Sequence, residues 1–387
     1  MVSHARLHAD LIGLLRQHGR CRDQRHLVLL AWMVAGLLLS QTVCFDRWKT
    51  ALPLGHCLAA SWQRRCRRWF SNARIDGEEL YGPLILWALQ NWQKPGQALH
   101  LALDTTMLWN RCCVVVLSVV CHGRAIPLLW RTLEHPSASV SAEISIALLA
   151  KADRLLAGFG AITVLADRAF PSADLLSWFD GKPRWQYVMR LRADTWIHGT
   201  AAPMGCEVRR LRLPRGYCRG FRDVQLWADG SQKANLLLAH PSGIAIDEPW
   251  YLVSNADPTL DLVWSYAKRF CCEQLFRDQK SGLLQLESSG LRDPARIDRL
   301  LLGGHRRIGG QPAGLCRQHR RPAPSGGSPL AARHELCADR PGLPAAVRRQ
   351  CRQGLARLDA NPETRAGTLH PQQGREAPPT TALVHAH

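Results

Sequence analysis

Apolar positions follow a helical spacing near the start of the chain and a strand-like pattern further on. Long apolar runs of helical length, such as Leu27 to Cys44 (LVLLAWMVAGLLLSQTVC), dominate the early part. From His100 onward, shorter runs rich in β-branched residues alternate with helical spacing. The change of period predicts a helical region over residues 1–97 and a mixed region over residues 98–302, with the boundary between Gln93 and Gln97.

The mixed region is predicted to fold in the order β-β-β-α-β-α-β. Three β-rich runs come first and should form an antiparallel meander, at residues 100–109, 111–123 and 124–134. They are followed by a helix, a strand, a second helix and a further strand, at residues 141–156, 161–170, 171–179 and 184–192. This order predicts an α/β fold with a ribonuclease-H-like core, and residues 195–247 look like a β-rich insertion in it.

The stretch from Tyr266 to Lys280 (YAKRFCCEQLFRDQK) contains no glycine or proline and is predicted to be one continuous helix. At about 100° per residue, four of its polar residues fall within a wedge of roughly 60° on one face: Tyr266, Arg269, Glu273 and Lys280. The opposite side should pack on a core through Trp264, Cys271 and Leu275. A solvated helix face with ion pairs is the alternative interpretation.

The chain is strongly basic, with 50 Lys and Arg against 31 Asp and Glu and a formal net charge of +19. Such a charge favours a polyanionic partner, with nucleic acid ahead of a membrane surface. The 14 cysteines include no C-x-x-C pair and often lie in apolar runs, which is typical of reduced thiols in a cytosol. The polar start of the chain indicates no secretory signal peptide.

The apolar run from Leu27 to Cys44 approaches the length of a membrane span. It is interrupted by Gly36 and ends in the polar residues Ser40, Gln41 and Thr42. We therefore expect a buried helix of a helical domain and no membrane partner.

A second helical stretch, Leu58 to Ile75 (LAASWQRRCRRWFSNARI), combines arginines with aromatic residues. Its four clustered arginines could lie on DNA phosphates or enter a groove: Arg64, Arg65, Arg67 and Arg68. An exposed basic helix with core tryptophans at Trp62 and Trp69 is the equally weighted alternative.

The composition changes after Leu302. Residues 303–387 contain no Trp, Phe, Tyr, Met or Lys and are rich in Arg, Pro, Gly and Ala. Such a segment buries too little apolar surface to offset its ordering entropy, so we predict disorder. The abrupt change also fits a frameshifted reading of a GC-rich gene, and a functional basic tail is the alternative.

Two acids lie at or just beyond the ends of predicted strands, Asp104 and Asp167. Neighbouring strands of one sheet can bring such carboxylates together, and a divalent cation would relieve their repulsion. Hard oxygen ligands suit Mg²⁺ or Mn²⁺, and Glu273 on a helix over the sheet would complete the set. Taken singly, each acid could be an ordinary strand-end residue.

Three motifs together resemble the DDE transposases of bacterial insertion sequences. They are DTT at Asp104, LADRAF around Asp167, and Tyr266-x2-Arg269-x3-Glu273-x6-Lys280. The last spacing resembles the branch named for the fourth insertion sequence. The resemblance covers roughly residues 20–302, and it departs from the family in the alanine of DRAF and in the loss of apolar sequence after Leu302.

This resemblance implies Asp104, Asp167 and Glu273 as catalytic ligands of a two-metal Mg²⁺ site in which Mn²⁺ can substitute. It implies that Tyr266, Arg269 and Lys280 contact phosphates at the cleaved transposon end. The family forms a hairpin intermediate in which a tryptophan stacks on a flipped base. Trp250 is the candidate here, and a core tryptophan is equally favoured at that position.

The implied protein is a transposase of the bacterial cytoplasm, associated with the nucleoid. Its N-terminal helices would bind terminal inverted repeats, and a DNA-bound homodimer would cleave these ends and transfer them to target DNA. Three alternatives stay open: a truncated transposase that only binds element ends, another ribonuclease-H-like DNA endonuclease, and a membrane protein built on Leu27 to Cys44.

Overall fold

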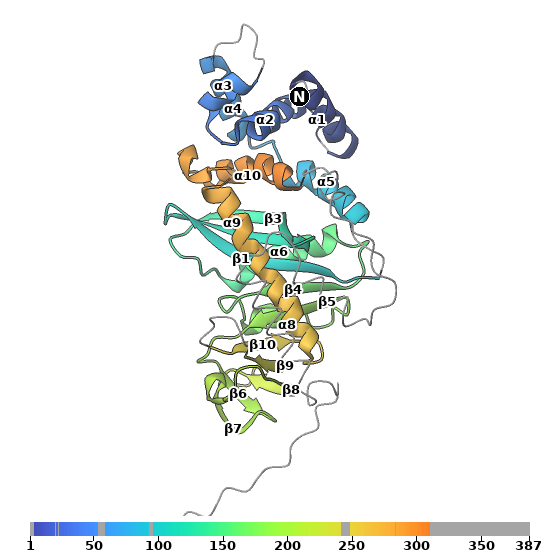
Figure 1. Ribbon diagram of the computed structural model, residues 1–387, viewed down its shortest axis with the longest axis vertical. Helices are drawn as coiled ribbons and strands as arrows, with labels where there is room; N and C mark the ends of the chain where they lie inside the picture. Colours follow the sequence, from blue (N-terminus) through green and yellow to red (C-terminus); the bar gives the residue numbers. More distant parts are fainter. Residues whose placement is uncertain are drawn as a thin grey trace, which may run out of the picture.

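The computed structural model describes residues 4–19, 21, 23–52, 59–92, 96–240, 248–282 and 284–309. Helices occupy the first part of the chain, as the apolar spacing predicted (Figure 1): α1 His4–His18, α2 Gln24–Ser40, α3 Phe45–Ala51, α4 Ala59–Phe70 and α5 Gly77–Trp92. Asp23 caps α2, because its side chain accepts a hydrogen bond from the Arg25 amide at 2.9 Å. The predicted boundary at residues 93–97 falls partly outside the described residues.

A single ten-stranded sheet follows, so the molecule is a mixed α/β protein. Its strand order is β3-β2-β1-β4-β5-β10-β9-β8-β6-β7. The strands are β1 Leu99–Leu108, β2 Cys112–Cys121, β3 Arg124–Glu134, β4 Ile162–Ala166, β5 Trp185–Arg190, β6 Trp196–Gly199, β7 Ala202–Glu207, β8 Cys218–Leu226, β9 Gln232–Ala239 and β10 Trp250–Ser254.

The first three strands form the predicted antiparallel meander. Trp109 and Asn110 both have a φ of 52° between β1 and β2, and His122 and Gly123 have φ values of 49° and 75° between β2 and β3. Two successive residues with positive φ are characteristic of the tight two-residue turns that connect the strands of a β-hairpin. β4 then pairs in parallel with β1 on one side and with β5 on the other.

The segment expected to be a β-rich insertion extends the same sheet. β10 returns between β5 and β9, and it pairs antiparallel with both. The strands β9, β8, β6 and β7 therefore continue outward from the central strands, and they lie at the lower end of the molecule in Figure 1.

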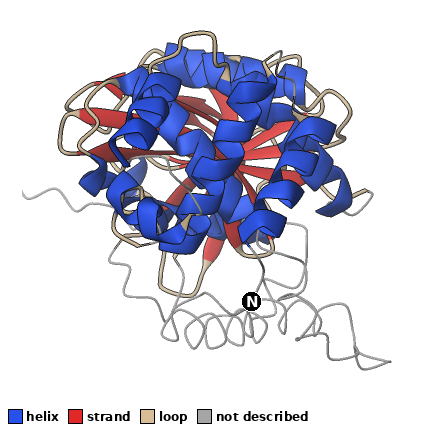
Figure 2. Cartoon of the chain, turned by 90° about the horizontal axis from the view of Figure 1, so that it is seen from above, coloured by secondary structure: helices blue, strands red, loops and turns tan. Residues whose placement is uncertain are grey.

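Helices cover both faces of the sheet. Helix α8 (Leu260–Ala267) packs on the face that contains Leu165, Val188 and Trp250. Along a strand, alternate residues point to opposite faces, so Tyr187 points the other way. The Tyr187 ring meets Phe179 at 4.9 Å, just beyond α7 (Ala173–Ser177), and α6 (Ala142–Leu155) lies beside α7. Figure 2 shows the helices stacked over the strands, seen from above.

The apolar run at Leu27 to Cys44 forms α2, and most of that helix is buried in the core. Within the described ranges, no helix combines the length and apolar character that a membrane crossing requires.

The last described helix, α10 (Pro294–Gly309), corrects the expected end of the folded chain. The helix continues through Gly303 and Gly304, whereas we expected it to stop there. It contacts α2, α4, α5 and β3, so it lies between the N-terminal helices and the sheet (Figure 1). One continuous core therefore runs from Leu15 to Leu302 across the expected domain boundary. The predictions for the tail beyond Gly309 lie outside the described residues.

Candidate functional site

Asp104 and Asp167 are brought together by the pairing of β1 and β4. Leu103 pairs with Ala166 in the parallel register, so the next residue of each strand is a neighbour of the other. Asp167 points to the same face as Leu165, which packs under α8. Asp104 points to the same face as His100, whose ring lies 3.1 Å from the Lys268 Nζ. Both acids therefore face the segment that runs from α8 through Lys268.

The stretch from Tyr266 to Lys280 is not one continuous helix, contrary to our expectation. Helix α8 ends at Ala267, a 3₁₀ turn spans Lys268–Phe270, and α9 runs over Cys271–Lys280. A 3₁₀ turn has fewer residues per turn than an α-helix, so it changes the direction of the side chains beyond it.

The side of this segment that packs on the sheet also differs from our expectation. The buried residues are Leu262, Val263, Tyr266, Arg269, Cys272, Leu275 and Gln279. Leu275 is buried as predicted, but Cys272 takes the place expected for Cys271. Tyr266 and Arg269 belong to the buried side, so only this part of the expected polar wedge faces the sheet, and Glu273 is exposed.

Arg269 holds Asp104 in a buried ion pair. Its Nη1 donates to the Asp104 Oδ2 at 2.7 Å, and Arg269 is only 8% exposed. The other carboxylate oxygen, Oδ1, accepts a hydrogen bond from the Thr105 amide at 2.9 Å. Arg269 and Asp104 thus meet directly, although the sequence indicated only that they share a site.

The pKa values in this pair reflect burial and neighbouring charge. Burial, with smaller contributions from the Asp167 and Glu273 carboxylates, raises the pKa of Asp104 to about 6 in spite of the Arg269 guanidinium. Burial is the largest single influence on the pKa of Arg269 and acts to lower it, but the Asp104 carboxylate together with Tyr266, Asp167 and Cys272 raises this pKa overall. The three acids therefore share one local field, and Glu273 itself is exposed to solvent.

The donor types fit a hard divalent cation, because three carboxylates act on one another at this edge of the sheet. In this structure, however, the three carboxylates are not gathered around one point. Among the described residues, no three His, Cys, Asp or Glu side chains lie in positions that could hold a metal ion together. In addition, Arg269 occupies Oδ2 of Asp104.

Trp250 and Tyr266 are both buried on this face of the sheet. Trp250 is 3% exposed and Tyr266 is 1% exposed, and their rings meet edge to face at 5.1 Å. Phe270 lies next to both rings. In this structure, Trp250 thus occupies the position of a core tryptophan. Base stacking by Trp250, or phosphate contact by Tyr266, would require these side chains to become exposed.

Lys280 is the last residue of α9, two turns beyond Glu273 along the helix. It is half-buried. The structure therefore places Lys280 on the same helix as Glu273.

Our sequence reasoning missed Arg190, the last residue of β5. It shares a face with Val188 and lies close enough to Tyr266 to influence the pKa of that phenol. Its Nη2 lies 3.2 Å from the Glu248 carboxylate, and its buried Nε has no hydrogen-bond partner among the described residues. The signal was available, because Arg190 ends the strand next to the one that leads to Asp167.

The four arginines of α4 form a separate basic surface. Arg64, Arg65, Arg67 and Arg68 are all exposed, whereas Trp62 and Trp69 on the same helix are buried. Both interpretations of this stretch therefore agree with the structure, since the tryptophans fill the core and the arginines face solvent.

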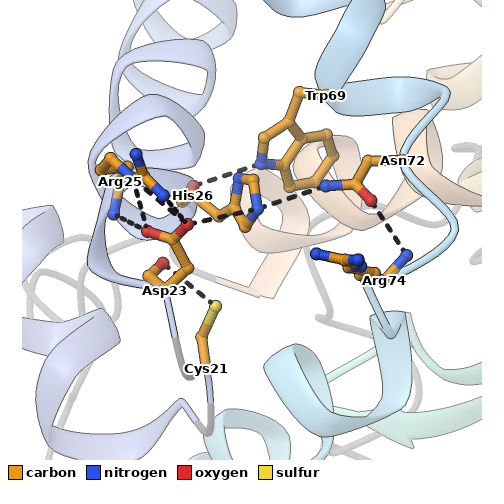
Figure 3. Close-up of polar contacts among 7 residues, drawn as sticks. All are labelled: Cys21, Asp23, Arg25, His26, Trp69, Asn72 and Arg74. Atoms are coloured by element: carbon orange, nitrogen blue, oxygen red, sulfur yellow. Dashed lines mark hydrogen bonds and ion pairs between the residues drawn. The ribbon is translucent and has the colours of Figure 1, made fainter.

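A polar network fixes the end of α4 against the start of α2 (Figure 3). The Trp69 Nε1 donates to the His26 carbonyl oxygen at 3.2 Å, and the Asn72 side chain meets the His26 ring at 3.2 Å. Asp23 joins the network through the His26 ring, whose Nε2 lies 3.8 Å from the Asp23 Oδ2, and Asp23 also accepts hydrogen bonds from Arg25. The exposed Arg74, whose amide donates to Asn72, adds a cation beside the α4 arginines.

No family model matches the chain, and no curated protein matches it. A search of solved structures gave a match to a piggyBac transposase in a synaptic complex with hairpin DNA. The two chains are 11% identical, the match covers 88% of this chain and 89% of the other, and the TM-score is 0.39. A TM-score and identity this low do not establish a shared function.

Proposed function

We propose that this chain is a DDE transposase of a bacterial insertion sequence with a ribonuclease-H-like core. The observation that supports it is that Asp104 on β1 and Asp167, directly after β4, are neighbours across two parallel strands, with the Glu273 carboxylate near enough to raise the pKa of Asp104. The strand order 3-2-1-4-5 at one side of the sheet agrees with the proposed core. The branch with the Tyr-Arg-Glu-Lys spacing remains part of this proposal.

Asp104, Asp167 and Glu273 would hold one or two Mg²⁺ ions, with Mn²⁺ as a substitute. Bound metal would activate a water molecule and stabilise the leaving oxygen of a phosphodiester. Arg269 supplies a positive charge that favours the ionised form of the buried Asp104. Glu273 is the exposed member of the set, so it is the acid that DNA and solvent reach first.

Two guanidinium groups beside the acids are suited to a DNA phosphate. The Nε atoms of Arg190 and Arg269 are buried and have no hydrogen-bond partner among the described residues. A buried donor without a partner is costly, and guanidinium donors match phosphate oxygens well. A phosphate of the cleaved strand would satisfy both donors. Arg190 would thus join Tyr266, Arg269 and Lys280 as a residue that contacts DNA phosphates.

The α4 arginines would bind the terminal inverted repeats through their phosphates, because they are exposed on a helix whose other side is fixed in the core. Cutting two ends in one complex would require a homodimer on DNA. Target DNA would then accept the cleaved ends.

The test is nicking of a DNA end that contains the element's inverted repeat, with Mg²⁺ and with EDTA. The parent chain should nick only with metal, and Glu273→Gln or Asp167→Asn should lower the rate by at least about a hundredfold, since each removes a charged ligand. Glu143→Gln is the matched control, because Glu143 is an exposed acid in the first turn of α6. Parental nicking by both ligand variants would disprove the assignment.

A chain that binds element ends without cutting is the second candidate. The contact between Arg269 and Asp104 favours it, because that guanidinium occupies a carboxylate oxygen that a metal would need. Intact binding in a gel shift, with no nicking at any Mg²⁺ or Mn²⁺ concentration, would select this function. Equal nicking of ends that lack the repeat would instead indicate a less specific endonuclease.

A further inference from the structure

The outer part of the sheet contains a second group of arginines, far from both α4 and the acids in the sequence. Four exposed arginines lie between η1 (Val208–Arg210) and the first half of β8: Arg210, Arg212, Arg215 and Arg219. We call them the outer arginine surface.

Two acids near this surface are already engaged by other arginines. Glu207 accepts a hydrogen bond from the Arg209 Nε at 2.7 Å, and Asp257 lies 3.2 Å from the Arg222 Nε. Arg210, Arg212 and Arg219 have no ion pair with another residue of the described ranges. The surface thus keeps a net positive charge after its local ion pairs are counted.

The loop that holds these arginines is fixed to the end of β9. The Gly216 amide donates to the His240 carbonyl oxygen at 2.7 Å, and the His240 amide donates to the Tyr217 carbonyl oxygen at 3.0 Å. The His240 ring adds a contact to the Leu213 carbonyl oxygen at 3.0 Å. Three contacts to one residue hold the loop between Arg212 and Arg219 in place. Binding a partner would therefore cost little conformational entropy in this loop.

Aromatic side chains lie between the arginines. Tyr217 is 46% exposed, and the Arg219 guanidinium lies over the Phe221 ring at 4.8 Å from its centroid. Basic residues interleaved with exposed aromatic rings are typical of surfaces that track a nucleic-acid backbone. A membrane surface would need a larger apolar face, as an amphipathic helix provides, and this surface is a loop and a strand.

This surface and the α4 arginines lie at opposite ends of the molecule. In Figure 1, α4 is at the top and β6, β7 and β8 are at the bottom, with β1, β4 and α9 between them. The two basic surfaces therefore lie on either side of the acids along the long axis. DNA that is held at one end by α4 leaves the outer arginine surface free for another stretch of DNA.

We propose that the outer arginine surface binds the phosphodiester backbone of DNA, without regard to sequence, as a second contact separate from α4. The proposal rests on the proposed function only in taking DNA as the partner. It requires neither a metal nor cleavage.

The experiment measures binding of the full chain to DNA of unrelated sequence in EDTA, so that failure of nicking does not affect it. The background carries glutamine at the four α4 arginines, which leaves the outer surface as the main contact. Arg210→Gln, Arg212→Gln and Arg219→Gln are then added together. Duplex and single-stranded DNA are compared, because both present the same backbone.

We expect the triple variant to lose roughly tenfold or more in affinity at low salt, and the slope of log K against log salt to fall by roughly 2 to 3, about 0.7–0.9 per lost contact. The control removes three cations elsewhere, by Arg111→Gln, Lys151→Gln and Arg154→Gln, which are all exposed. It should change the slope much less. Unchanged thermal melting shows that the variants are folded.

Equal slopes for the two triple variants would overturn the proposal. A loss of binding to phosphatidylserine vesicles with DNA binding unchanged would also overturn it and assign the surface to a membrane. If duplex and single-stranded DNA lose affinity alike, the backbone contact is supported for both. A loss with one of them supports it for that form.

Discussion

Helix α4 and the segment from α8 to α9 contain polar residues that we expected to face DNA, yet the structure uses them in opposite ways. On α4 the arginines point to solvent, and Trp62, Cys66 and Trp69 fill the core. On the segment that leads into α9, Tyr266 and Arg269 take the buried positions. The sheet explains the difference, because it presents the Asp104 carboxylate to Arg269 and nothing comparable to the α4 arginines.

Which way a polar helix face points therefore depends on what lies opposite to it. An arginine is rarely buried unless it is paired, and Arg269 is paired. The α4 arginines can contact a partner without any change in the fold. Buried residues such as Trp250 and Tyr266 contribute to the stability of the fold. Substitutions at such positions should therefore lower the free energy of unfolding.

The largest effect is expected from Trp250→Ala. Trp250 is buried against Tyr266 and Phe270, so removing the indole leaves a cavity and should lower the free energy of unfolding by about 4 kcal/mol. Chemical denaturation of the metal-free protein measures it. Trp87→Ala is the control in the helical region, because Trp87 is 42% exposed and should cost about 1 kcal/mol or less. Equal losses would show that Trp250 is not a core residue in solution.

Arg269→Ala should be the next in size. It leaves the buried Asp104 carboxylate without its partner, so we expect a loss of about 3 kcal/mol in the free energy of unfolding. Adding Asp104→Asn to this variant should recover part of the loss, because the uncompensated charge is then gone. The same denaturation measurement checks both. A loss below about 1 kcal/mol for the single variant would mean that the pair is open in solution.

Asp298 on α10 is a buried carboxyl group that, unlike Asp104, has no arginine of the described ranges bound directly to it. Its Oδ1 accepts hydrogen bonds from the Thr132 amide at 2.9 Å and from the Thr132 hydroxyl at 2.6 Å. Burial raises the pKa of Asp298 to about 7. Between about pH 4 and pH 7 the folded state therefore keeps a proton that the unfolded state has released.

Stability should consequently fall as the pH rises through this window and level off above pH 7. Asp298→Asn removes this pH-dependent contribution. At pH 8 the free energy of unfolding of the variant should exceed that of the parent by about 2 kcal/mol, and at pH 4 the two should differ little. The gain is smaller than the pKa shift alone would give, because the new amide must find a partner for its N–H groups. Denaturation curves across the pH range measure it. A parallel pH dependence in both proteins would refute the role of Asp298.

Much of the fold followed from apolar patterning, because strands and helices of this length have distinct periods. The meander, the place of Asp104 and Asp167 and the exposure of the α4 arginines were all accessible in that way. The inward direction of Arg269 was not, because the wedge was calculated for an unbroken helix and the 3₁₀ turn at Lys268–Phe270 changes it. The return of β10 beside β5, which brings Trp250 under α8, depends on long-range pairing that no local pattern contains.

The smallest effect on stability is expected on α4. Arg67→Ala and Arg68→Ala should each change the free energy of unfolding by less than about 0.5 kcal/mol, because both side chains are exposed. The same two variants should reduce the salt slope of DNA binding by roughly 0.9 each if the arginines contact phosphates. Denaturation and binding titrations on the same preparations separate the two effects. A loss above about 1 kcal/mol in stability would show that these arginines, like Arg269, are needed by the fold itself, and the contrast between the two helices would then disappear.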